Sequence, residues 1–156
     1  MKSKAYLETT IVSYLAGSPS RDIVIAAHQR ITQEWWARRN RFELFVSEAV
    51  VQEATRGDVV VAARRATLLS GIPVLDLGAE VHDLANGLLR ARAVPEKALV
   101  DAIHIAVAAV NRIDYLLTWN CTHIANAAVR GKIEQACRAA GLQAPAICTP
   151  EELMEA

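Results

Sequence analysis

The segment from Lys97 to Arg112 is apolar on nearly every side of a helix, and it constrains the fold more than any other part of the chain. A helix of this kind packs in the interior of a protein. Only Asp101 and His104 interrupt the apolar run, and because they lie three residues apart they share one face of the helix. A buried carboxylate without a partner costs several kcal/mol or becomes protonated. We therefore expect Asp101 to bind a metal ion or to form a salt bridge.

Short apolar strands alternate with helices along the whole chain. The patterns predict strands at 5–7, 42–46, 73–77, 115–118 and 146–148, and helices at 11–16, 22–39, 47–56, 59–69, 80–93, 97–112 and 125–140. A short terminal helix is expected to open at Thr149 and Pro150. This alternation is typical of a Rossmann-like, three-layer α/β domain. We expect one domain over residues 1–156, with a mainly parallel sheet of about five short strands and helices on both faces.

Composition excludes several classes of protein. Seventeen basic and seventeen acidic residues cancel, so any binding to nucleic acid must depend on a local surface. The three cysteines form no CxxC pair, which indicates a reducing compartment. The N-terminus has no signal-peptide pattern, and no stretch approaches the roughly 18 apolar residues of a membrane span. We expect a cytoplasmic protein that does not enter membranes. The glycine-rich loops that cradle nucleotide phosphates are missing as well.

Two further carboxylates lie where apolar side chains would be expected. Glu8 ends the first strand, and Glu53 lies on the inward face of the helix at 47–56. In open parallel sheets the ligand site lies beyond the carboxyl ends of the strands, where the strand order reverses. Asp101 near the start of the buried helix and Asn120 after the fourth strand can reach the same place. We expect the side-chain oxygens of Glu8, Glu53 and Asp101 to converge there and share a cation.

Four segments of the chain resemble the signature blocks of PIN domains, and in particular of the VapC-type toxins of bacterial toxin–antitoxin pairs. The segments are YLETTIVSYL, SEAVVQEATRGD, DAIHIAVAAV and LLTWNCTHIAN, which follow in order across nearly the whole chain. The resemblance implies a single PIN-like domain and a ribonuclease that cleaves RNA with water activated by Mg²⁺ or Mn²⁺. It implies that the catalytic residues are Glu8, Glu53, Asp101 and Asn120, and that Glu8, Glu53 and Asp101 bind the metal. It also implies a homodimer and a small antitoxin protein as partner.

Two residues depart from the family pattern, in which the first and last acids are usually aspartates. Here they are Glu8 and the neutral Asn120. Asn120 offers an oxygen but no charge, so a second cation would bind less tightly than among four acids. The alternative function is therefore a catalytically weakened PIN-like module that associates with RNA or an antitoxin without cutting. Thr10, Thr118 and His123 are candidates for supporting roles at the site.

The same residues also have purely structural interpretations. Asp101 can pair with Lys97 one helical turn earlier. Glu8 precedes two threonines and can stabilise a helix N-terminus through its charge. An asparagine after a strand, such as Asn120, is more often a turn or cap residue than a ligand. His104 is more readily explained as a hydrogen-bonded structural residue than as a catalytic one.

One further group combines aromatic rings with positive charge, and its members are Trp35, Trp36, Arg38, Arg39 and Arg41. Aromatic and basic side chains together can stack on bases and bind phosphate, which would make this group an RNA contact. Tryptophan and arginine are also enriched at protein interfaces, so a dimer or antitoxin contact is equally open.

Overall fold

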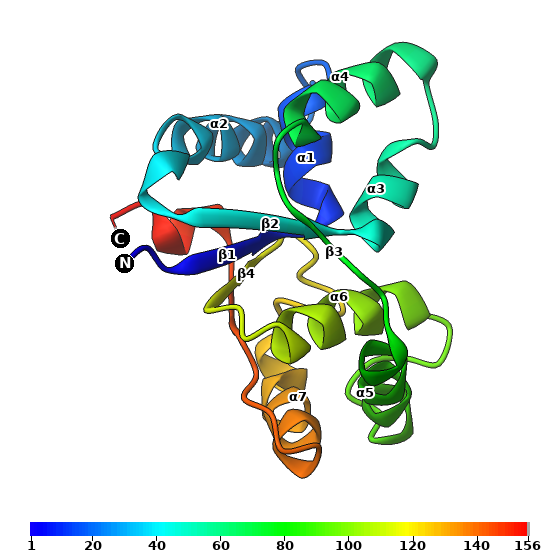
Figure 1. Cartoon of the computed structure of the whole chain (residues 1–156). Coiled ribbons are helices and arrows are strands. Elements are labelled where there is room, and N and C mark those ends of the chain that lie inside the picture. The colour runs from blue at the N-terminus through cyan, green and yellow to red at the C-terminus, as the bar shows by residue number, and fades with distance from the viewer. Residues whose placement is uncertain (156) are drawn as a thin grey trace.

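The computed structural model describes residues 1–155, and in these residues a five-stranded sheet lies between two layers of helices (Figure 1). The strands are β1 (Lys4–Leu7), β2 (Glu43–Ser47), β3 (Val74–Leu75), β4 (Tyr115–Leu117) and β5 (Ala146–Cys148). Their order across the sheet is β3-β2-β1-β4-β5, and every neighbouring pair is parallel. The predicted α/β class, with its parallel sheet, is therefore confirmed.

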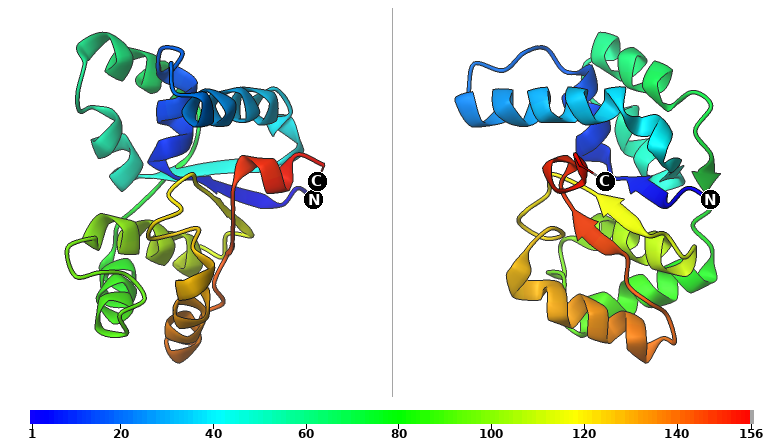
Figure 2. Two further views of the ribbon diagram at one scale, coloured as in Figure 1. Left: turned by 180° about the vertical axis from the view of Figure 1, so that it is seen from behind. Right: turned by 90° about the vertical axis from the view of Figure 1, so that its left-hand side faces the viewer.

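The helices divide between the two faces of the sheet, as the views in Figure 2 also show. One layer contains α1 (Thr9–Ala16), α2 (Ile23–Ala37), α3 (Glu48–Ala54) and α4 (Val59–Leu69). The other contains α5 (Ala79–Arg90), α6 (Leu99–Val110) and α7 (Ala127–Ala139). Two short 3₁₀ helices complete the described chain, η1 (Arg39–Arg41) and η2 (Pro150–Leu153). Within residues 1–155, no helix has both the length and the apolar character needed to cross a bilayer.

Local sequence signals account for several of the observed boundaries. The carboxylate of Asp22 accepts hydrogen bonds from the first backbone N–H groups of α2, and Asp58 does the same for α4. Gly57, with φ of 85°, supplies the left-handed turn between α3 and α4. The predicted strand at 73–77 shortens to Val74–Leu75 because β3 is an edge strand that pairs only with β2. The predicted terminal helix is a 3₁₀ turn.

The helix α6 is the most buried helix of its layer, as its apolar pattern predicts. It lies against the sheet on one side and contacts α5 on the other (Figure 1). Its residues from Ala102 to Ala109 are all buried, and His104 has no exposed surface. Asp101 occupies the partly exposed first turn of α6. The structure therefore places His104, and not Asp101, as the polar group of the buried stretch.

Candidate metal centre

Glu8 lies at the point where the strand order reverses, between the ends of β1 and β4. Its backbone N–H donates to the carbonyl of Leu117 at 3.0 Å and so extends the pairing of the two strands. Its side chain is 4 % exposed, and its Oε1 accepts hydrogen bonds from the hydroxyls of Thr10 and Thr118, both at 2.5 Å. The carboxylate is thus held at the carboxyl edge of the sheet, where ligands bind in this class of fold.

The two threonine hydroxyls donate to Glu8, and each of them also accepts a backbone hydrogen bond. Thr10 Oγ1 accepts from the N–H of Trp119 at 2.9 Å, and Thr118 Oγ1 accepts from the N–H of Asn120 at 2.9 Å. Each hydroxyl therefore has its proton available for Oε1 of Glu8. The turn after β4 and the start of α1 together fix one oxygen of this carboxylate.

Glu53 reaches the same place from α3. Its Oε1 accepts from Thr9 Oγ1 at 2.6 Å and lies 2.7 Å from Nε2 of His104. Partial burial by itself would raise the pKa of the Glu53 carboxyl, but the hydrogen bonds from His104 and Thr9 outweigh burial and lower the pKa below its ordinary value. The side chain is 30 % exposed, so the ionised carboxylate is also open to solvent.

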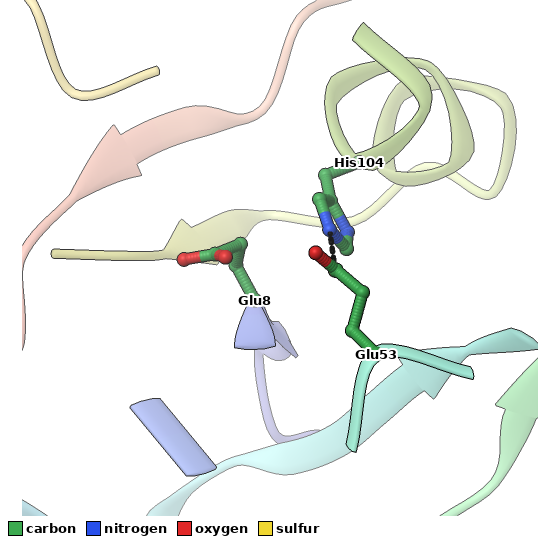
Figure 3. A group of neighbouring side chains, drawn as sticks. All are labelled: Glu8, Glu53 and His104. Carbon is green, nitrogen blue, oxygen red and sulfur yellow. Dashed lines mark hydrogen bonds and ion pairs between the residues drawn. The ribbon is translucent and has the colours of Figure 1, made fainter. Parts of the chain in front are cut away.

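His104 joins Glu53 to the core of the sheet. Its Nδ1 lies 2.6 Å from the hydroxyl of Tyr6, and that hydroxyl lies 2.8 Å from Oγ of Ser47. Figure 3 shows Glu53 and His104 pointing toward each other, with Glu8 beside them at the end of β1. One ligand atom from each of Glu8, Glu53 and His104 lies within 4.8 Å of the others. The sequence interpretation of His104 as a hydrogen-bonded residue agrees with these contacts.

The donor atoms of this group fit a divalent cation. Carboxylate oxygens are the ligands that Mg²⁺ and Mn²⁺ prefer, and Mn²⁺ also accepts imidazole nitrogen. Glu8 and Glu53 bring two negative charges to a place where one carboxylate is nearly buried. Two acids so close together are stabilised by a cation between them.

Asp101 lies one helical turn before His104 on α6, outside the group of atoms that lie within 4.8 Å of one another. Its side chain lines a shallow hollow together with Lys97 and His123. Among the ion pairs of residues 1–155 there is none between Asp101 and Lys97, so the structural interpretation of Asp101 has no support here. Of the three carboxylates expected to converge, Glu8 and Glu53 therefore lie together, and His104 takes the place expected for Asp101.

Asn120 shapes the turn that follows β4. Its Oδ1 accepts a hydrogen bond from the backbone N–H of His123 at 3.1 Å. The amide oxygen is therefore used within the turn, as the structural interpretation of this residue expects. His123 itself is half-buried and lines the hollow beside Asp101.

The group of tryptophans and arginines separates into core and surface. Trp35 has no exposed surface and stacks on Phe42 with ring centroids 5.7 Å apart, so it cannot contact RNA or a partner protein. Arg38 and Arg41 donate to backbone carbonyls at the end of η2, which gives both a structural role. Trp36 and Arg39 remain accessible in part, with the guanidinium of Arg39 4.3 Å from the Trp36 ring centroid.

Comparison with known proteins finds similarity in structure and no match in sequence. No family model matches the chain, and no curated protein matches it. The crystal structure of VapC20 from Mycobacterium tuberculosis, described as a sarcin-ricin loop cleaving toxin, is similar with a TM-score of 0.61 and 19% identity. The similarity covers 76% of this chain and 92% of VapC20.

VapBC2 from Rickettsia felis, solved with a DNA fragment from its promoter, is also similar, with a TM-score of 0.56 and 14% identity. Here the similarity covers 94% of this chain and 98% of the matched chain. At such low identity the two comparisons establish the fold. The chain is thus similar in structure to the VapC toxins over most of its length, and it has the PIN-like fold that its four sequence blocks predict.

Proposed function

We propose that this protein is a metal-dependent ribonuclease that hydrolyses RNA phosphodiester bonds with Mg²⁺ or Mn²⁺. The observation that carries the proposal is the convergence of the Glu8 and Glu53 carboxylates at the carboxyl edge of β1 and β4. Its fold is also that of VapC20, a toxin described as cleaving the sarcin-ricin loop. We assign the metal to Glu8 and Glu53, with Asp101 from the first turn of α6 as a third ligand.

The side chains of the site have distinct roles in this proposal. A bound divalent cation supplies an activated water and stabilises the charge that develops on the phosphate. Thr10 and Thr118 orient the Glu8 carboxylate, since both donate to its Oε1. Asp101 is partly exposed at the start of α6, and in this proposal it completes the ligands of the cation. Orienting the ligands before the substrate arrives lowers the cost of assembling the site.

The surface next to Asp101 favours RNA as the substrate. His123 lines both the hollow beside Asp101 and a second, larger hollow that extends to the C-terminal end of α5. Arg90 and Arg92 line this second hollow together with a single acid, Glu96. Basic side chains along a path that leads to clustered acids can hold a phosphate backbone in place.

Single-turnover cleavage of a mixed RNA pool with Mn²⁺ tests the proposal. We expect Glu8→Gln to lower the rate by about 100-fold or more, because it removes a charged ligand of the cation, and losing even a residue that only orients such a ligand costs about 10–100-fold. Asp101→Asn should also lower it. Asn120→Asp should increase the rate, because a fourth acid strengthens the binding of a second cation. If the parent protein and Glu8→Gln cleave RNA equally, the site does not perform the reaction.

The second candidate function is a PIN-like module that binds RNA or an antitoxin without cutting. The observation that favours it is the neutral Asn120, whose amide oxygen is engaged by the N–H of His123. The two candidates differ in the outcome of one pair of measurements. A module of this kind would bind RNA in a gel-shift assay, and neither Mn²⁺ nor Asn120→Asp would produce cleavage.

We further propose that the partners are a second copy of this chain and a small antitoxin protein. Large apolar side chains are exposed at the first turns of α2 and α4, with Ile23 at 84%, Val24 at 59%, Val59 at 82% and Val60 at 61%. Exposed apolar residues in pairs are typical of surfaces that a partner covers. Light scattering after size exclusion gives the mass, and a monomer at micromolar concentration would contradict the homodimer.

A further inference from the structure

A row of four hydrogen-bonded side chains runs from the sheet to the candidate metal centre. Ser47 ends β2, Tyr6 lies in β1, His104 in α6 and Glu53 in α3. The successive distances between the bonded atoms are 2.8, 2.6 and 2.7 Å. Ser47, Tyr6 and His104 are buried, so solvent does not compete for the first two of these hydrogen bonds. We call this row the Ser47–Glu53 relay.

The last member of the relay determines the direction of the hydrogen bonds. Oε1 of Glu53 accepts a hydrogen bond from the hydroxyl of Thr9 at 2.6 Å, so this oxygen acts as an acceptor and carries no hydrogen for the ring. The hydrogen between Glu53 and His104 must therefore belong to Nε2 of the ring. In a neutral imidazole whose Nε2 carries the hydrogen, Nδ1 is an acceptor. The Tyr6 hydroxyl must then donate to Nδ1 of His104.

The beginning of the relay agrees with this direction. The buried hydroxyl of Tyr6 has two partners, Nδ1 of His104 and Oγ of Ser47, so its one hydrogen can go to His104 while its oxygen accepts. Because its single hydrogen goes to His104, the Tyr6 oxygen accepts from the hydroxyl of Ser47. Every hydrogen bond thus points from the sheet toward Glu53.

The direction of these hydrogen bonds decides whether His104 can bind a cation or can only hold Glu53. A nitrogen that carries a hydrogen has no lone pair for a metal. With its hydrogen on Nε2, His104 can only donate to Oε1 of Glu53, which Thr9 also holds. The second oxygen of Glu53 is then the one that can face a cation. In this arrangement, neither Tyr6 nor His104 binds the cation.

We propose that Tyr6 and His104 are positioning residues: Tyr6 fixes the Nε2–H tautomer of His104, and His104 orients the Glu53 carboxylate toward the cation. The proposal rests on the proposed function, because it concerns the same metal centre. Partners that orient a metal ligand typically change metal affinity by about 10–100-fold. The relay therefore ties cation affinity to two side chains that do not touch the cation.

The first arm of the test does not involve metal or RNA. Long-range ¹H–¹⁵N NMR of the histidine rings, recorded without metal, reports which ring nitrogen carries the hydrogen. We expect the Nε2–H tautomer for His104 in the parent protein and a mixture of tautomers in Tyr6→Phe. Ser47→Ala provides a milder variant, which removes the first donor and leaves the ring contacts intact. An Nδ1–H tautomer, or a ring protonated on both nitrogens, in the parent would overturn the proposal.

The second arm measures the affinity for Mn²⁺ alone by titration calorimetry. We expect Tyr6→Phe to weaken Mn²⁺ binding by about tenfold or more. Tyr14→Phe is the matched control, because the Tyr14 hydroxyl takes part in none of the hydrogen bonds described for residues 1–155. The Mn²⁺ affinity of this variant should equal that of the parent protein. His104→Gln should retain most of the affinity, since a glutamine amide can donate to Glu53 as the ring does.

The outcomes separate the positioning role from the proposed function. If Mn²⁺ binds the parent and Tyr6→Phe equally, the relay does not position Glu53 and the proposal is overturned while the metal centre stands. If His104→Gln abolishes binding and Tyr6→Phe does not weaken it, His104 is a direct ligand. If the parent binds no Mn²⁺ even though the tautomer is as expected, the proposed function fails, and the positioning role fails with it.

Discussion

Replacing Thr118 with valine removes one hydroxyl from the site and leaves the shape of the side chain almost unchanged. Thr118 has no exposed surface, and its Oγ1 donates to Glu8 Oε1 at 2.5 Å and accepts from the N–H of Asn120 at 2.9 Å. A hydrogen bond to a charged group contributes about 1.5–3 kcal/mol and a neutral one about 1 kcal/mol. We expect Thr118→Val to lower the free energy of unfolding by about 3 kcal/mol. For a chain of this size the melting temperature should then fall by about 6–12 °C.

Urea denaturation followed by tryptophan fluorescence, with EDTA present, measures this change. Thr118→Ser is the matched control, because it keeps the hydroxyl and loses only a methyl group, which should cost about 1 kcal/mol. In the double variant with Glu8→Gln, the effect of Thr118→Val should shrink, because the charged acceptor is gone. If valine costs no more than serine, the hydroxyl does not hold Glu8, and the geometry deduced for this carboxylate is wrong.

Two other predictions concern the cysteines and the glycines. Burial raises the pKa of Cys137 to about 11 and that of Cys148 to about 12, so both remain thiols at pH 8. A thiol-reactive dye should therefore modify only the exposed Cys121 in the native protein and all three cysteines after unfolding, and rapid modification of a second native cysteine would contradict this. In α7, Gly131→Ala should stabilise the protein by about 0.5–1 kcal/mol, because a helical glycine is unfavourable and nothing lies within 4 Å of the added carbon. By contrast, Gly57→Ala should destabilise it by about 1–2 kcal/mol because of its φ of 85°, and urea denaturation that ranks the two the other way would refute the backbone argument.

The order and type of the elements follow from patterns that are local in sequence. The helix Val59–Leu69 has the limits that its apolar spacing predicts, because Asp58 caps it. The nearly continuous apolar surface of α6 identifies it as an interior helix. The shorter extent of β3 could not be predicted, since it depends on pairing with one neighbour only.

The candidate site, too, could be predicted from the sequence only in part. Glu8 ends a strand and Glu53 lies on the inward face of a helix, so the sequence alone directs both to the carboxyl edge of the sheet. The relay could not be predicted, because Tyr6 meets Ser47 and His104 across 41 and 98 residues of chain. Such contacts depend on the register of β1 against β2 and on the rotation of α6. The three-residue spacing of Asp101 and His104 was the one available signal that His104 faces the site.

The place of a residue along or around its helix explains where Asp101 and Trp35 lie. Asp101 lies in the first turn of α6, where the helix emerges from the core, and is therefore partly exposed. Trp35 and Trp36 are adjacent in sequence, and neighbours on a helix point about 100° apart. One ring therefore enters the core and the other stays partly exposed. The sequence places the two tryptophans in one group, and only the packed structure shows that one is buried and the other partly exposed.

The most direct test of the metal centre is anomalous diffraction from crystals soaked in Mn²⁺. We predict one strong anomalous peak within coordinating distance of carboxylate oxygens of both Glu8 and Glu53. The same soak of Glu8→Gln crystals should lose most of that peak, because the variant removes a charged ligand. A parent crystal with no peak at these carboxylates, or with its strongest peak elsewhere on the protein, would contradict the assignment of this site to a cation.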